Sequence, residues 1–220
     1  MKLPFTVEQF LGVFKTYNES IFPLQLLFYL LAGAIVFLSV KTSVWSDKVI
    51  NSILAFFWVW MGIAYHILFF STINKAALLF GVLFTIQGLL FFYYGVLKPG
   101  IRYKVRQDTP GLMGTILVIF ALIVYPVLGY LFGHVYPLAP VFGVPCPTTI
   151  FSFGLLLWSD KKVPVIILII PFSWSLVGFS AATVLGMRED FALVLAGLLA
   201  TALLLFGKQG VQTAKGEIYK

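Results

Sequence analysis

The stretch GHVYPLAPVFGVPCPTTIF, residues 133–151, interrupts a chain that is otherwise apolar and helical in pattern. It contains four prolines and the only cysteine of the sequence: Pro137, Pro140, Pro145, Pro147 and Cys146. Proline lacks a backbone N–H and disfavours helix in the residue before it. The spacing therefore predicts that no helix begins before about residue 147. Pro147 then fits the first helical position, or Thr148 fits the cap.

A helix from residue 147 to Trp158 has about eleven residues and a length of roughly 16 Å. Because the hydrocarbon core of a bilayer is about 30 Å thick, this helix covers half of it, and Cys146 lies at depth. Non-helical backbone at that depth is either buried in protein or faces a watery cavity. The free N–H groups of Thr148 and Thr149 carry the positive end of the helix dipole. Many transporters hold their substrate at broken helices of this kind, so this segment is a candidate substrate site. The alternative is a proline-rich loop that only packs the bundle, with Cys146 as a small apolar side chain.

The composition of the whole chain indicates a membrane protein. Of its 220 residues, 60% are hydrophobic and 10% are charged, and the mean hydropathy is +1.01. Ordinary soluble domains are about a quarter charged, so most of this chain needs lipid as its solvent. The net charge of +7 does not indicate a nucleic-acid partner, because the basic residues are scattered among short loops.

Seven apolar segments are long enough, or nearly long enough, to cross a bilayer. They are residues 21–40, 49–70, 76–97, 111–132, 141–158, 163–185 and 191–206. All eight acidic residues lie outside them, and so do all the basic ones. We therefore predict an all-α integral membrane protein of about seven spans, the fifth short or broken. Residues 1–20 form an outer amphipathic helix, residues 21–208 a single transmembrane domain, and residues 209–220 a tail.

The distribution of lysine and arginine predicts the orientation. With seven spans, eleven of these residues fall on one side and four on the other. The positive-inside rule then places the N-terminus outside and the C-terminus in the cytoplasm. Without the fifth span the distribution is nearly even, seven against eight, which favours seven spans.

Residues 6–20 predict a short amphipathic helix on the outer membrane surface. Thr6 and Gln9 have the spacing of a capping box. Four apolar side chains share one face: Phe10, Val13, Phe14 and Tyr17. We expect this helix to anchor the chain or to cover one end of the bundle.

Three further polar side chains are candidates for a site. His66 and His134 fall in the same outer half as Cys146, and together the three side chains suit zinc or copper. Their spacing is not that of a known metal motif, and an intramembrane histidine also commonly bonds a neighbouring helix. Gln87 lies near the middle of the third span, where it either bonds across helices or lines a polar path.

Two segments, AYHILFFSTINKAALLFG (64–81) and the 133–157 stretch, resemble an uncharacterised family of bacterial multi-pass membrane proteins. The N-terminal PFTVEQFLGVFKTYN (4–18) fits the same family. The resemblance implies a location in the bacterial inner, or plasma, membrane. It implies no activity and no site residue.

The sequence thus favours a carrier or channel for a small solute or ion. Its candidate binding residues surround the broken fifth helix: Cys146, Thr148, Thr149, His134, His66 and Gln87. The alternatives are a zinc or copper protein that uses Cys146, His66 and His134, or an accessory subunit of a membrane complex.

An enzyme is disfavoured, because the chain has no paired carboxylates, no Ser/His/Asp set and no phosphate loop. The expected partners are the lipid bilayer and a small solute or ion. An intramembrane acid is also missing, which argues against proton coupling through a carboxylate.

Overall fold

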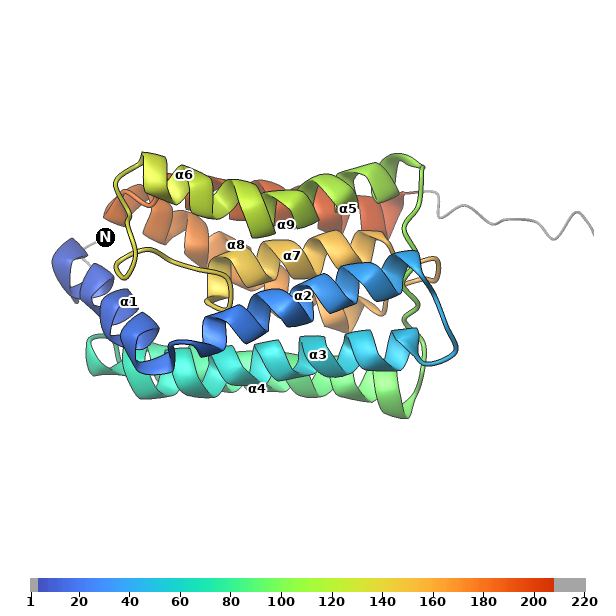
Figure 1. Ribbon diagram of the computed structural model, residues 1–220, viewed down its shortest axis with the longest axis horizontal. Coiled ribbons are helices and arrows are strands. Elements are labelled where there is room, and N and C mark those ends of the chain that lie inside the picture. The colour runs from blue at the N-terminus through green and yellow to red at the C-terminus, as the bar shows by residue number, and fades with distance from the viewer. Residues whose placement is uncertain (1–3, 208–220) are drawn as a thin grey trace, which may run out of the picture.

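A computed structural model describes residues 4–207, which are all-helical and form no β-sheet (Figure 1). The predicted tail, residues 209–220, lies outside the described residues. The α-helices are α1 (Val7–Ile21), α2 (Leu24–Val40), α3 (Ser46–Trp60), α4 (Ala77–Phe92), α5 (Thr109–Ile119), α6 (Tyr125–Leu131), α7 (Pro145–Leu157), α8 (Val165–Leu185) and α9 (Phe191–Phe206). Irregular turns extend or join them: η1 (Met61–Phe69), η2 (Phe70–Thr72), η3 (Tyr93–Leu97), η4 (Phe120–Val124) and η5 (Arg188–Asp190).

From α2 to α9 the chain runs back and forth along the long axis of one bundle (Figure 1). The connections 41–45, 98–108 and 158–164 gather at one end, which we call the basic end. The connections 73–76, 132–144 and 186–187 gather at the opposite end, together with α1. We call this the α1 end.

Five helices are long and apolar enough to cross a membrane. They are Ser46–Thr72, Ala77–Leu97, Thr109–Leu131, Val165–Leu185 and Arg188–Phe206. The number rises to six if α1 and α2, which meet at a bend of 85°, count as one broken span. Since α2 has 17 residues and α7 has 13, both are shorter than the helices in that set. Seven crossings stay a prediction.

The predicted amphipathic helix is confirmed as α1. Both hydrogen bonds of the capping box between Thr6 and Gln9 are present. The predicted apolar face is buried: Phe10, Val13, Phe14 and Tyr17. This face packs on the α1 end of the bundle, so α1 covers that end, as expected (Figure 1).

The short fifth helix is confirmed as α7, but it begins at Pro145 and not at residue 147. The first residues of a helix make no intrahelical N–H bond, so two prolines are tolerated in the first turn. At about 1.5 Å per residue, α7 is roughly 20 Å long. Every residue of α7 except Cys146 is buried. A helix that is apolar all round belongs inside a bundle, and the neighbouring α5, α8 and α9 pack against α7.

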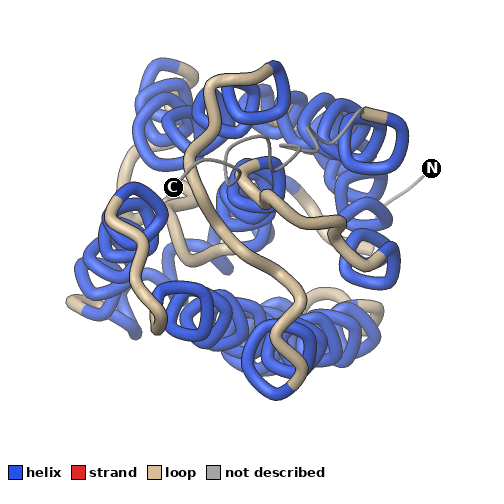
Figure 2. Tube along the Cα trace, turned by 90° about the vertical axis from the view of Figure 1, so that its right-hand side faces the viewer, coloured by secondary structure: helices blue, strands red, loops and turns tan. Residues whose placement is uncertain are grey.

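Loop 98–108 crosses the basic end of the bundle (Figure 2). Its Tyr103 fixes it to α3: the backbone N–H donates to Asp47 Oδ1 over 2.9 Å, and the hydroxyl donates to Asn51 Oδ1 over 2.9 Å. Burial raises the pKa of Tyr103 well above its ordinary value, and the nearby Asp47 charge raises it further. The phenol therefore keeps the proton that it donates to Asn51.

Candidate functional site

A cavity of about 320 Å³ lies at the α1 end, beside the start of α7. Its walls come from α1, from the region that joins η1 to α4, and from α8. Aromatic rings dominate the lining: Phe10, Phe14, Tyr65, Phe70, Phe80 and Trp174. The volume lies at the lower end of the range for small-molecule sites, so a small solute fits it.

Polar groups share one wall of this cavity. Cys146 lines it and is the one residue of α7 that is not buried. Asp190, at the end of η5, also lines it, and its Oδ1 accepts a 2.6 Å hydrogen bond from the Tyr125 hydroxyl. The indole Nε1 of Trp174 is buried and has no hydrogen-bond partner within residues 4–207. The cavity thus combines an apolar lining with a carboxylate and a free donor.

Two acids of the loop between the sixth and seventh predicted spans are buried in the bundle. Glu189 and Asp190 are only 1% and 3% exposed. Glu189 Oε1 lies 2.7 Å from His134 Nδ1, while Oε2 has no partner in the described chain. The short η5 turn directs both acids inward at the start of α9. The bundle therefore holds two buried acidic side chains at its α1 end.

Side chains of α1 satisfy the irregular segment before α7. Asn18 donates to the carbonyls of Pro137 and Ala139 over 2.7 and 2.8 Å. The Tyr17 hydroxyl donates to the Gly143 carbonyl over 3.3 Å. Gly143 has φ +105°, and an added Cβ would lie 2.3 Å from a ring carbon of Phe28, so only glycine fits. The last part of the segment is thus buried, at residues 140 and 142–144, whereas much of 132–139 is exposed.

His66 lies in η1, a π-helical turn that continues α3. Its ring is fully buried between aromatic neighbours, with centroids 4.6 Å from Phe84 and 5.1 Å from Trp174. Neither ring nitrogen has a partner in the described part of the chain. The expected hydrogen bond from His66 to a neighbouring helix is therefore not formed. The His66 ring packs against Trp174, which lines the cavity, but His66 itself does not line it.

The other predicted site residues, Gln87, Thr148 and Thr149, are buried inside the bundle and do not line the cavity. Gln87 Nε2 donates to the Ile167 carbonyl over 3.0 Å, which confirms the bond across helices. Thr148 Oγ1 accepts the Gly143 N–H over 3.1 Å and so fastens the approach to α7. Thr149 is buried, and neither threonine lines the cavity.

Within residues 4–207, no group of three or more His, Cys, Asp or Glu side chains is arranged to hold a metal ion. His134 bonds Glu189, His66 is enclosed by aromatic rings, and Cys146 lines the cavity. The three predicted metal ligands are therefore not brought together in the described chain.

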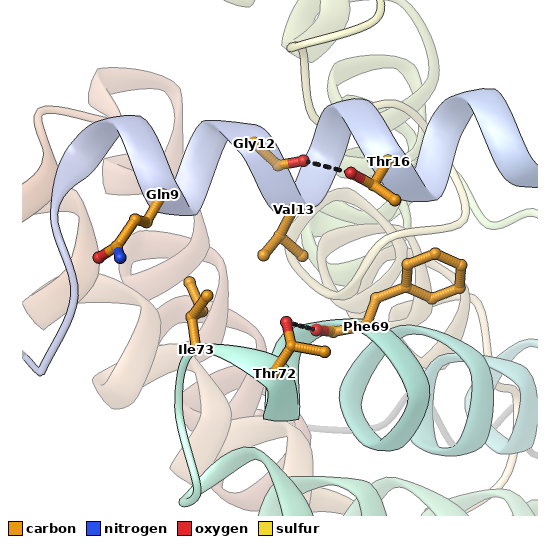
Figure 3. Close-up of a pocket in the computed structure, with 7 residues that line it drawn as sticks. All are labelled: Gln9, Gly12, Val13, Thr16, Phe69, Thr72 and Ile73. Atoms are coloured by element: carbon orange, nitrogen blue, oxygen red, sulfur yellow. Dashed lines mark hydrogen bonds between the residues drawn. The ribbon is translucent and has the colours of Figure 1, made fainter.

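A second, more open hollow lies between α1 and η1–η2 (Figure 3). Its hydroxyls bond within their own helices: Thr16 donates to the Gly12 carbonyl and Thr72 to the Phe69 carbonyl (Figure 3). No buried donor or acceptor is left free among its lining residues. This hollow is therefore a packing groove beneath α1 and a weaker candidate than the cavity.

Sequence reasoning missed the residues that give the cavity its character. Asp190, Trp174 and Tyr65 were not among the predicted site residues. The only signal was the pair of acids in MREDF (187–191), directly before an apolar segment. Their inward direction depends on Tyr125 and His134, which are more than fifty positions away in sequence.

The fold is a helical bundle in which five or six helices are long and apolar enough to cross a membrane, and it contains a mostly aromatic cavity near one end. The chain belongs to a family of unknown function, DUF6064, whose profile matches residues 7–215. Comparison with curated proteins and with solved structures gave no match.

Proposed function

We propose that the protein is a membrane carrier or channel that binds a small solute in the cavity beside Cys146. The observation that carries the proposal is the buried carboxylate of Asp190 on the wall of an otherwise aromatic cavity. A buried charged group is costly unless it is paired or has a ligand, and it marks functional positions in membrane proteins.

The position of the cavity agrees with this role. It lies where the helical path is interrupted, between loop 132–144 and the first turn of α7. Interrupted helices are common substrate sites in transporters. The cover formed by α1 separates the cavity from the end of the bundle, so movement of α1 would open a path for the solute.

The proposal places seven crossings in a bacterial plasma membrane, with the α1 end outside. Support comes from the basic residues of the described chain. Eight of them lie at the basic end: Lys41, Lys48, Lys98, Arg102, Lys104, Arg106, Lys161 and Lys162. Three lie at the α1 end: Lys15, Lys75 and Arg188. Basic loops favour the cytoplasmic side, and this distribution requires α2 and α7 to count as crossings.

Reporter fusions test this arrangement. Fusions after Lys41, Arg106 and Lys162 are expected to give a cytoplasmic signal, because these residues belong to the basic end. Fusions after Asn74 and Pro140 are expected to give an external signal. A cytoplasmic signal from the Pro140 fusion would contradict the seven crossings.

Reaction of Cys146 with a thiol reagent tests access to the cavity. We expect slow labelling of the native protein by a small, charged, membrane-impermeant reagent, and little by a bulky one. Cys146 lines the cavity and is the one residue of α7 that is not buried, so a small reagent that enters the cavity reaches its thiol. A single cysteine gives no background from other thiols. Labelling is measured by mass spectrometry in membrane vesicles.

Two matched tryptophan substitutions on α8 show whether the reagent passes through the cavity. Val177 lines the cavity and Val184 does not, although both side chains are exposed. Val177→Trp should slow the labelling of Cys146, and Val184→Trp should leave it unchanged. A carrier also exposes its site to the opposite side in turn, so inside-out vesicles should label more slowly but measurably. Labelling from the α1 side alone would contradict a carrier, and no labelling before unfolding would contradict the cavity itself.

A further inference from the structure

We infer that the solute is a small organic ammonium ion with an apolar body. This inference rests on the proposed function and names the class of solute for the same cavity. It follows from three observations. The lining has one acidic side chain and many aromatic rings, and the first turn of α7 offers few free backbone N–H donors.

The lining is acidic and not basic. Among the described residues that line the cavity, Asp190 is the one acidic side chain, and none is a lysine, an arginine or a histidine. Glu189 precedes it in the chain and is also buried, so a second carboxylate adds to the same field. Charges in such an environment are weakly screened, and bringing an anion beside them would be strongly unfavourable. A cationic solute instead gives the Asp190 carboxylate a partner.

The aromatic walls favour a cation that carries apolar groups. Phe10 and Phe14 approach from α1, Phe70 from η2 and Trp174 from α8. The faces of aromatic rings attract ammonium ions, and Trp does so best. The same rings bury apolar surface of the solute, which an inorganic cation does not have. The lining therefore suits an organic ammonium ion better than a metal ion.

The start of α7 does not reverse this preference. The N-terminus of a helix ordinarily attracts anions through its free N–H groups. Here Pro145 and Pro147 have no N–H, and the Thr148 N–H is directed to the Val144 carbonyl over 3.4 Å. This corrects the expectation that Thr148 offers a free donor. The Trp174 indole Nε1 is a neutral donor, so it adds no positive charge to this wall.

Three probes with the same phenyl group and different charges test the inference. They are 2-phenylethylammonium, 2-phenylethanol and 3-phenylpropanoate, titrated by calorimetry into the purified full chain in detergent at neutral pH. The ammonium ion should bind about tenfold more tightly than the alcohol, since a charge-assisted hydrogen bond contributes more than a neutral one. The carboxylate should bind most weakly.

Two matched substitutions identify the group responsible. Asp190→Asn should reduce affinity for the ammonium ion about tenfold and leave affinity for the alcohol nearly unchanged. Asp160→Asn, at an exposed acid of the basic end, should change neither. If Asp190→Asn does not fold, the order of the affinities of the three probes for the unsubstituted protein still tests the inference.

Equal binding of the three probes would overturn the ammonium inference and leave the solute site standing. Tighter binding of the carboxylate would also overturn it, in favour of an anion site. If no probe binds while Cys146 remains accessible to the thiol reagent, the inferred class of solute is wrong and the cavity is retained. Failure of the proposed function would instead appear as loss of that accessibility.

Discussion

Gly154→Leu is expected to destabilise the protein more than any other single substitution proposed for it. An added Cβ at Gly154 would lie 2.8 Å from the Gly114 carbonyl oxygen and 3.0 Å from the Val118 amide nitrogen. Both contacts are with the backbone of α5, which cannot move as a side chain can. Overpacking of this kind costs about 3 kcal/mol or more, so the melting temperature in detergent should fall by roughly 6–12 °C.

Gly33→Leu is the matched control for this experiment. Gly33 lies within α2, is exposed, and has nothing within 4 Å of an added Cβ. Leucine there should change the free energy of unfolding by less than about 1 kcal/mol, with a favourable sign from helix propensity. If Gly154→Leu melts as Gly33→Leu does, the close approach of α5 to α7 is wrong.

His134→Ala is expected to have the second largest effect. His134 Nδ1 is the hydrogen-bond partner of the Glu189 carboxylate, and the other oxygen of that carboxylate already lacks one in the described chain. Removing the imidazole leaves a buried acid with no partner. The cost is about 1–3 kcal/mol, equivalent to a fall of roughly 2–12 °C in melting temperature.

A double substitution distinguishes loss of the interaction between His134 and Glu189 from loss of the packing of the His134 ring. In the His134→Ala background, Glu189→Leu removes the unpaired acid and should recover most of the lost stability. Simple addition of the two single effects would mean that His134 and Glu189 do not interact in solution.

Local features could be predicted from the sequence, because their causes lie within a few residues. The capping box of α1 joins residues three apart, and the buried face of α1 follows the helical repeat. The proline pattern likewise predicted a short fifth helix. The start of this helix was predicted two residues too late. The prediction applied the rule that proline disrupts a helix interior, whereas Pro145 lies in the first turn, where proline is tolerated.

The cavity could not be predicted, because its causes are distant in sequence. Asp190 and Glu189 look like ordinary charges between two apolar segments, and their burial depends on Tyr125 and His134. Cys146 was identified for a local reason, the proline pattern around it. Its neighbours on the cavity wall come from α1 and α8, which no local pattern connects to α7.

The enclosure of α7 has a consequence for how the chain would assemble in the membrane proposed for it. With 13 residues, α7 is too short to be stable in lipid by itself, and its buried surface requires protein on all sides. The helix α5 is synthesised before α7, but α8 and α9 are synthesised after it. The site at Cys146 is therefore completed late: a nascent chain that ends after α7 lacks both the Trp174 wall and the Asp190 carboxylate. The cavity thus has its complete lining only after Asp190, directly before the last helix, has been made.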